Sequence, residues 1–396
     1  MKFNINKSLK AAIIVAAFGI TISSCNKSLP EAEPITTPAP TGSSINTLLN
    51  DASFSILKAA VTRAGTSLTK LLSDSTAVFT FFAPDNDAFI RSGIPSEAAI
   101  AAFRAGQLDT LLRYHLIGGI KIMAADISED IPNMYLQSGF VLAPPSASLP
   151  PGLRMPIFPS RRGSFAWVNN IPVTQADIAA SNGVIHKVAT LVAPPGQVLL
   201  QRVASDPDLT YLFAAVQRAD SGDAAKTLQS ALQNPAANLT VFAPTNAAFQ
   251  AILTGQITLA LMGMGYDLAT AQATAAALAS SPTVFQNPAL ASVLTPTVVK
   301  GIVVYHLLGI RAFSVNIPAT ATALPTLLNG AITAHPGITV QATFGPAGVT
   351  AATVKGVGNA TASNVLINPT PAPGGTSDQH YINGTLHKID QVLIPQ

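Results

Sequence analysis

The chain has 396 residues, enough for two or three domains that each bury a core of their own. Charged residues make up only 10% of the chain and hydrophobic residues 48%, which excludes disorder driven by excess charge. The formal net charge of +3 comes from Lys2, Lys7 and Lys10, and the rest of the chain is formally neutral. Beyond the pair Arg161 and Arg162 there is no basic cluster to neutralise phosphates, so nucleic acid is not expected as a partner.

The N-terminus has the layout of a secretory signal. The three lysines lead into an apolar run at residues 11–22, which is followed by Ser23, Ser24 and Cys25. A helix of this length reaches about 18 Å, short of the roughly 30 Å hydrocarbon core, so no membrane-spanning helix is expected. The residues Ile-Ser-Ser-Cys resemble the bacterial lipobox, in which the signal is cut before the cysteine and the cysteine is acylated. This resemblance implies a signal peptide at residues 1–24 and lipidation of Cys25.

Cys25 is the only cysteine of the chain, so it can form neither an internal disulfide nor a Cys-rich zinc site. A free thiol is the alternative. Acyl chains on Cys25 would hold the protein on a membrane without a spanning helix. Residues 25–43 are rich in Pro, Ser and Thr and are expected to form an extended linker. We therefore expect a lipid-anchored protein of the cell envelope, on the outer membrane, facing either the cell surface or the periplasm.

The remainder of the chain contains two copies of one unit. Three short motifs each occur twice in the same order: residues 80–89 and 240–249, 114–116 and 305–307, and 182–187 and 383–388. Ordered matches of this kind predict two tandem domains, residues 44–194 (domain 1) and 197–394 (domain 2). The offset grows from 160 to 191 and then to 201, which places 31 extra residues of domain 2 within residues 251–299.

This insertion is rich in Ala, Leu and Thr and is expected to be helical around residues 268–279. Gln256, Asp267 and Gln272 interrupt its apolar sequence, which argues against a membrane crossing. We expect an extra helix pair that covers domain 2, or a face against which a partner packs.

Both domains are predicted to begin with helices. Amphipathic patterns predict a helix at residues 54–61 and its counterpart at 209–216. Short β-branched and aromatic runs then predict buried strands at 78–82 and 239–242, and a proline follows each run closely and should end the strand.

After these strands, Asp85 and Thr245 are expected to cap helices that carry Phe89 and Phe249 inward. Later strands are predicted at residues 168–173, 338–343 and 350–355. A tight Asn-Gly turn at residues 182–183 and 383–384 should precede the last strand of each domain. Helices first and strands afterwards indicate an α+β architecture.

The three repeated motifs are similar to the signatures of the fasciclin domain family. They are the strand-turn-helix Thr-x-Phe-Ala-Pro-x-Asn-x-Ala-Phe, the Tyr-His dipeptide and the closing Asn-Gly-x-x-His-Lys. The resemblance implies that each domain is a β-sandwich-like wedge with several helices. It also implies adhesion or extracellular binding of a protein or polysaccharide, rather than catalysis. Where family members often carry an acidic residue, domain 1 has Asp87 but domain 2 has Ala247.

The six histidines are the side chains most suited to catalysis or ligand binding. His115 and His306, like His186 and His387, occupy equivalent positions in the two domains, which favours part-buried imidazoles hydrogen-bonded to the backbone.

The resemblance implies an alternative for the Tyr-His pairs, namely contact with a cell-surface receptor. The candidate binding residues are Tyr114, His115, Tyr305 and His306. His335 and His380 have no counterparts and no metal-ligand spacing around them, so no metal site is expected.

No catalytic or cofactor-binding motif stands out. The sequence lacks a nucleophile elbow and a P-loop, and the glycine pairs at 263–265 and 356–358 lack the third glycine of the dinucleotide fingerprint, so no cofactor is expected. Asp126, Glu129 and Asp130 raise the possibility of glycoside hydrolysis, but carboxylates within one short loop are more typical of solvated surface charge.

These patterns favour a non-catalytic, lipid-anchored envelope protein whose tandem domains bind another protein or a glycan. The alternative is a carbohydrate-processing accessory protein or weak glycoside hydrolase, in which the insertion of domain 2 shapes a cleft. A third possibility is a structural spacer without a ligand.

Overall fold

The computed structural model describes residues 42–129, 131–145, 152–345, 348–368 and 375–396. The chain divides into a unit of residues 1–40 and a compact unit of residues 41–396. Cys25, the expected signal peptide and nearly all of the expected linker lie outside the described residues. In the part of the chain that is described, no helix combines the length and apolar character needed to cross a bilayer.

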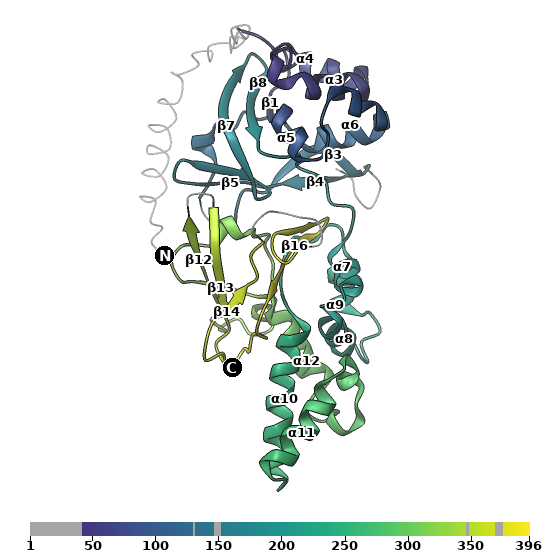
Figure 1. The fold of residues 1–396 in the computed structure, drawn as a ribbon, viewed down its shortest axis with the longest axis vertical. Coiled ribbons are helices and arrows are strands. Elements are labelled where there is room, and N and C mark those ends of the chain that lie inside the picture. The colour runs from purple at the N-terminus through teal and green to yellow at the C-terminus, as the bar shows by residue number, and fades with distance from the viewer. Residues whose placement is uncertain (1–41, 130, 146–151, 346–347, 369–374) are drawn as a thin grey trace, which may run out of the picture. The chain divides into compact units, whose positions relative to one another are not determined.

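Domain 1 opens with short helices (Figure 1). Its helical elements are α2 (Ile45–Leu48), η1 (Ala52–Phe54), α3 (Ser55–Ala64), α4 (Thr66–Ser73), α5 (Asn86–Arg91), η2 (Glu97–Ala102), α6 (Ala105–Tyr114) and η3 (Ala124–Asp126). The helix predicted at 54–61 is confirmed by α3, whose buried side chains recur every three or four residues, as an amphipathic helix requires.

The main sheet of domain 1 has six strands in the order β2-β1-β8-β7-β6-β5. Their bounds are β1 (Phe79–Pro84), β2 (Leu116–Gly118), β5 (Pro159–Arg162), β6 (Phe165–Val168), β7 (Ile171–Ala180) and β8 (Gly183–Val188). A separate two-stranded ladder joins β3 (Leu136–Ala143) and β4 (Leu153–Ile157). Strands β1 and β8 pair in parallel, and the other neighbours in the six-stranded sheet pair antiparallel.

The β structure predicted at residues 168–173 is present, but a turn divides it between two strands. Strand β6 ends at Val168 and β7 begins at Ile171. Between them, Asn169 and Asn170 have φ angles of 47° and 68°. Two asparagines in the left-handed region form the two-residue turn whose twist suits an antiparallel hairpin. The apolar residues on either side of this turn continue one pattern along the sequence, which hides the reversal of the chain.

Domain 2 repeats this order with a much longer helix after its first strand. They are α7 (Leu199–Ser205), α8 (Thr210–Ala219), α9 (Thr227–Gln233), α10 (Asn246–Gly263), α11 (Leu268–Ala279), η4 (Pro282–Gln286), η5 (Pro288–Leu290), α12 (Pro296–Tyr305), η6 (Ser314–Asn316) and η7 (Leu327–Gly330). The helix predicted at 209–216 is confirmed by α8, and α11 covers the residues of the insertion that carry the helical pattern.

The sheet of domain 2 has the order β10-β9-β16-β14-β13-β12-β11, with β15 paired to β16. The strands are β9 (Leu239–Pro244), β10 (Leu307–Leu308), β11 (Thr322–Leu324), β12 (Ile338–Gly345), β13 (Gly348–Lys355), β14 (Ser363–Val365), β15 (Gln379–Tyr381) and β16 (Gly384–Ile389). Strands β9 and β16 pair in parallel, as β1 and β8 do in domain 1. The predicted α+β architecture is confirmed, as are the strands predicted at 338–343 and 350–355.

The last strand of each domain begins with a glycine because another backbone passes close to it. A Cβ atom on Gly183, which has a φ angle of 149°, would overlap the carbonyl oxygen of Phe79. A Cβ atom on Gly384 would lie 2.6 Å from the carbonyl oxygen of Leu239. The predicted turns lie one residue earlier than expected, at residues 181–182 and 382–383, so each glycine serves the parallel pairing rather than the turn.

The two predicted N-caps are confirmed. Asp85 Oδ1 accepts a hydrogen bond of 3.0 Å from the backbone N–H of Ala88, and Thr245 Oγ1 accepts one of 3.2 Å from that of Ala248. These bonds satisfy N–H groups that have no partner within the first turn of a helix. The helices α5 and α10 therefore start at the same point in both domains and carry a buried phenylalanine inward.

Candidate functional site

The asparagine of the first repeated motif ties two helices together. In domain 1, Asn86 Oδ1 accepts a hydrogen bond of 3.0 Å from the backbone N–H of Ile56, at the start of α3. Asn246 makes the same bond to Tyr211 in domain 2, at 3.1 Å. A side chain used in this way in both domains supports the fold and is not available to a ligand.

The asparagine of the third motif is buried and bonds to two further segments. Asn182 Oδ1 accepts from the backbone N–H of Ile45 at 2.8 Å, and its Nδ2 donates to the carbonyl oxygen of Leu72 at 3.0 Å. Asn383 repeats both bonds in domain 2, at 2.9 Å and 2.8 Å. Because a buried amide left without partners is costly, this residue holds the N-terminal helices against the last strand.

The tyrosines of the predicted Tyr-His pairs lie inside the domains. Tyr114 donates a hydrogen bond of 3.0 Å to the carbonyl oxygen of Pro156 and accepts one of 2.7 Å from Nδ2 of Asn169. Tyr305 donates to the carbonyl oxygen of Gly337 at 2.6 Å. Burial raises the pKa of both hydroxyls, so both stay protonated and act as donors.

The histidines of these pairs are neutral and fixed in one tautomer. His115 Nε2 accepts from the backbone N–H of Val192 at 2.9 Å, so Nδ1 carries the proton and donates to the carbonyl oxygen of Leu111 at 2.8 Å. His306 repeats both bonds, each at 2.8 Å. Burial lowers the pKa of each imidazole to about 4. Each histidine therefore joins the end of a helix to the segment after the last strand.

The four candidate binding residues expose at most 1% of their surface. This burial agrees with an architectural role and leaves these side chains no surface that a partner could reach on the closed domain. Receptor contact through Tyr114, His115, Tyr305 and His306 stays a prediction, and it would require a domain to open.

The other equivalent pair of histidines is also buried. His186 Nε2 donates to the carbonyl oxygen of Ile122 at 2.8 Å, and His387 Nε2 donates to that of Ala312 at 2.9 Å. Each bond links the last strand to the loop that follows the second strand of its domain. The part-buried imidazoles expected from the sequence are fully buried in both domains.

The two histidines without a counterpart in the other domain also make hydrogen bonds. His335 Nε2 lies 2.8 Å from the carbonyl oxygen of Pro395, and His380 Nε2 accepts from a guanidinium nitrogen of Arg311 at 2.8 Å. Within the described ranges, no three His, Cys, Asp or Glu side chains are grouped so that they could hold a metal ion.

The acidic loop of domain 1 uses its carboxylates locally. Asp126 Oδ2 accepts from the backbone N–H of Met123 at 2.9 Å, and Glu129 pairs with Arg161 at 2.8 Å. Asp130, the third member of this cluster, lies outside the described residues. Both described carboxylates are thus held by local partners, whereas glycoside hydrolysis needs two carboxylates on opposite sides of a cleft.

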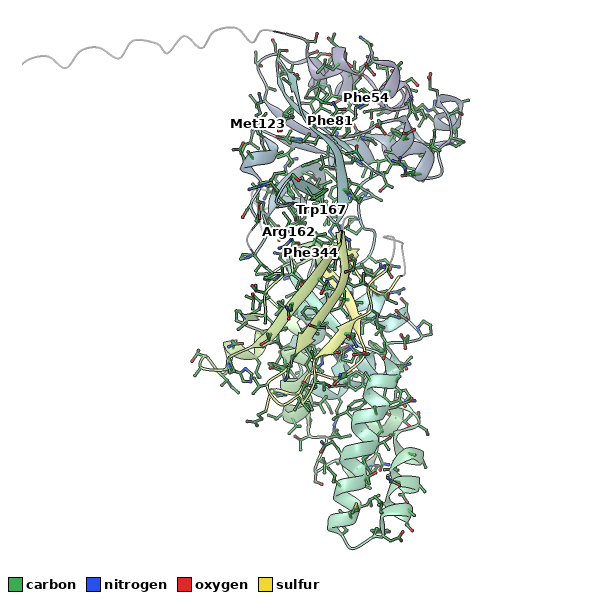
Figure 2. All side chains as sticks on the ribbon, turned by 60° about the vertical axis from the view of Figure 1, so that its left-hand side comes forward. Phe54, Phe81, Met123, Arg162, Trp167 and Phe344 are labelled. Atoms are coloured by element: carbon green, nitrogen blue, oxygen red, sulfur yellow. The ribbon has the colours of Figure 1, made fainter. Side chains whose placement is uncertain are left out.

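The two domains meet through polar and aromatic contacts that the sequence motifs do not mark. The guanidinium of Arg162 lies 3.9 Å above the ring of Phe344 and donates to the carbonyl oxygen of Ile317 at 3.1 Å. Asn316 Nδ2 donates to Ser160 Oγ at 2.7 Å. Figure 2 shows Arg162 and Phe344 beside each other where the domains meet. We call these contacts, with those of Arg311, the domain joint.

Arg311 is completely buried in this joint. Besides its bond to His380, it donates to the carbonyl oxygen of Tyr381 at 3.2 Å, and its guanidinium lies 4.7 Å from the ring centre of Phe158 in domain 1. Burial lowers the pKa of Arg311 to about 10, so it remains charged at neutral pH. Burial and this charge together lower the pKa of His380 well below its usual value. Sequence reasoning missed Arg311 because neither a carboxylate nor a repeated motif accompanies it.

Domain 1 has an open groove of about 790 Å³ between α3 and η2. Its lining carries four charged side chains of both signs, Asp51, Lys58, Arg63 and Glu97. Asp51, Arg63 and Glu97 are exposed, whereas Lys58 is half-buried and donates a hydrogen bond of 3.2 Å to Oδ1 of Asn46. The sequence did not mark this groove, because its residues carry no motif and are brought together from three separate elements.

In domain 2, exposed apolar side chains lie at the end of α10, in the connection after it and at the start of α11. The exposed fractions are 65% for Leu259, 43% for Met262, 74% for Met264, 50% for Tyr266 and 51% for Leu268. Figure 1 shows α10 and α11 side by side, with their connection pointing away from the sheet of domain 2. Like the groove of domain 1, this surface takes no part in the hydrogen bonds that recur in both domains.

Both halves of the chain match the same known family. The family model of the fasciclin domain matches residues 52–194 and again residues 207–395. A segment of 156 residues, 39% of this chain, is 33% identical to transforming growth factor-beta-induced protein ig-h3 of Sus scrofa and covers 20% of that protein. A segment of 145 residues, 36% of this chain, is 35% identical to protein sll1483 of Synechocystis sp. and covers 68% of it. The match therefore spans only about a fifth of the Sus scrofa relative.

A comparison with solved structures finds a FAS1 domain pair from the insect cell adhesion molecule fasciclin I. The match covers 88% of this chain and 95% of that one, with 16% identity and a TM-score of 0.32.

Proposed function

Since the chain belongs to the fasciclin domain family, we propose that it is a non-catalytic adhesion protein of the cell envelope that is held on a membrane by a lipid on Cys25. Its partner is an extracellular or envelope protein or a polysaccharide. The observation that carries this proposal is that the polar side chains shared by both domains are consumed by internal hydrogen bonds. Binding therefore depends on the exposed surface of the domains and not on these shared side chains.

The groove between α3 and η2 is the surface we assign to the partner. Lys58 and Glu97 lie among its lining residues, so a polar partner meets both signs of charge there. The alternative of carbohydrate processing has less support, because Asp126 is engaged within its own loop and Glu129 pairs with Arg161 of β5.

Binding of the full chain to a panel of immobilised extracellular proteins and polysaccharides tests this function. We expect at least one member to bind and the variant Arg63→Glu, at an exposed residue of the groove, to weaken that binding about tenfold or more, as reversal of a contacting charge does. Lys70→Glu makes the same charge change on α4, at an exposed residue outside the groove, and should bind as the unaltered protein does.

Two outcomes would contradict the proposal. Turnover of a polysaccharide that is lost on substitution of Asp126 or Glu129 would favour the hydrolase, and no binding to any member of the panel would favour a spacer.

The lipid anchor is tested separately by the mass of the N-terminal peptide. We expect the mature protein to begin at Cys25 and to carry acyl chains, and the variant Cys25→Ala to lack them. An unmodified Cys25 would contradict the anchor. Protease treatment of intact cells then distinguishes display on the surface from the periplasmic face.

A further inference from the structure

The connection between α10 and α11 forms an uncovered apolar end of domain 2. We call residues 259–268 the hairpin tip. Every residue from 262 to 270 is exposed. Within the tip, Leu259, Met262, Met264, Tyr266 and Leu268 are each between 43% and 74% exposed. A cluster of large apolar side chains this exposed marks a surface that meets something other than water.

The base of the same two helices is packed normally. Leu253 and Ile257 of α10 are buried, as are Ala271, Ala275 and Ala279 of α11. These residues belong to the hydrophobic core of domain 2 or pack against the neighbouring helix. The hairpin is therefore held firmly at its base, and its tip is exposed because the helices extend beyond the core.

Charge is almost absent from this region. Between Lys226 and Lys300 the sequence has one charged residue, Asp267. Its carboxylate accepts a hydrogen bond of 3.0 Å from the backbone N–H of Thr270 and caps α11. A helix that faces water normally carries charged side chains on its outer face. The outer face of α10 and α11 carries none of them apart from this cap.

The distribution of the exposed side chains indicates which occupant covers them. They lie on the last turns of α10, on the connection and at the start of α11, so they occupy the end of the hairpin rather than one face of a single helix. A folded protein would cover one side of such a tip, whereas acyl chains can cover all sides. From Leu259 to Met264 the helical rise is about 7 Å, within the roughly 5–10 Å that interfacial helices reach below the headgroups. Tyr266 is the kind of residue that is enriched at that level.

We propose that the hairpin tip inserts into the headgroup and outer acyl region of one leaflet of a zwitterionic membrane. The hairpin does not cross the bilayer, because no described helix is long and apolar enough to do so. With an acidic residue as its only charge, the tip has no attraction to anionic lipid. This contact goes beyond the adhesion role and does not require a lipid on Cys25.

A fluorescent probe placed at the tip tests the insertion. Because Cys25 is the only cysteine, the full chain with Cys25→Ala and Met264→Cys has a single thiol for an environment-sensitive nitrobenzoxadiazole label. With phosphatidylcholine vesicles, we expect a blue shift and a severalfold rise of emission. The matched control places the label at Val357→Cys, an exposed position in domain 2 outside the hairpin, where emission should not change.

Adding Met262→Ser and Leu268→Ser to the labelled chain should weaken the vesicle response about tenfold or more, because two apolar side chains no longer enter the lipid. Circular dichroism checks that the helices remain. An unchanged emission at residue 264, equal changes at residues 264 and 357, or stronger binding to phosphatidylglycerol vesicles would each overturn the proposal. A rise of emission without vesicles that depends on protein concentration would instead indicate a second copy as the occupant. All these chains lack Cys25, so the result is independent of the anchor.

Discussion

The lysine of the closing motif has different surroundings in the two domains. In domain 1, Lys187 donates to Ser53 Oγ at 3.2 Å and lies 4.9 Å from the ring centre of Phe54. In domain 2, Lys388 is buried and pairs with Asp206 at 2.9 Å and with Asp208 at 3.1 Å. The same backbone position therefore accepts an aromatic and hydroxyl environment in one copy and a buried ion cluster in the other.

The helices after the first strand differ in the same way. Helix α5 has 6 residues and α10 has 18, yet both begin at an N-cap of the same kind. Growth occurred at the C-terminal end, where no hydrogen bond of the repeated motifs is made. The repeated motifs therefore fix the start of these elements, whereas their far ends are free to diverge and to form surfaces of their own.

The largest expected effect comes from the glycine that opens the last strand. Gly183→Ala should lower the free energy of unfolding by about 4 kcal/mol, because it adds backbone strain at a φ angle of 149° to a clash with Phe79. Gly384→Ala should cost about 2 kcal/mol, because one of its two close neighbours is the flexible side chain of Leu199. Urea unfolding of both variants measures the difference. Equal costs would show that close packing alone, and not the left-handed conformation, requires glycine here.

Acidification should weaken both domains through His115 and His306. Burial lowers the pKa of each to about 4, so each folded imidazole stays neutral while the unfolded chain takes up a proton below pH 6.5. Stability is therefore complete above pH 6.5 and falls by about 3 kcal/mol for each histidine as the pH drops to 4.

Urea unfolding at pH 7, 5.5 and 4.5 measures this loss, and His115→Asn should reduce the pH dependence of domain 1 alone, leaving the part due to His186, whose pKa burial also lowers. Stability that rises on acidification, or a variant with an unchanged slope, would contradict the assignment.

The smallest of these effects concerns the two lysines. Lys388→Met should cost about 2 kcal/mol, since it leaves the buried Asp206 with Arg202 as its remaining ion-pair partner. Burial raises the pKa of the Asp206 carboxyl, but its hydrogen bonds to Asp208 and Lys388 and the charges of Lys388 and Arg202 together lower it by more, so the net pKa lies below the usual value. The stability lost in Lys388→Met should therefore shrink once the pH is low enough to protonate this carboxyl. Lys187→Met removes one hydrogen bond to a hydroxyl and a cation–π contact at a part-buried site, and should cost only about 1 kcal/mol. Equal costs in thermal unfolding would mean that the ion cluster adds nothing to domain 2.

Much of each domain could be predicted because its signals are local. Asp85 and Thr245 cap helices whatever the rest of the chain does, since the bond they make spans three residues. The short strands before them were predictable for the same reason. The hairpin at Asn169 and Asn170 was missed because an apolar pattern does not record the direction of the chain.

Sequence patterns predict a pair of α+β domains, the starts of several of their elements and an insertion in the second domain. Periodicity, capping residues and the repeated motifs are properties of short segments, so they can be read before the chain folds.

The role of individual residues depends on how distant segments pack together. The tertiary structure placed Tyr114 and His115 inside the domain, buried Arg311 at the domain joint, and left the hairpin tip uncovered. Burial depends on segments that are distant in the sequence, and local patterns contain no information about which of them meet.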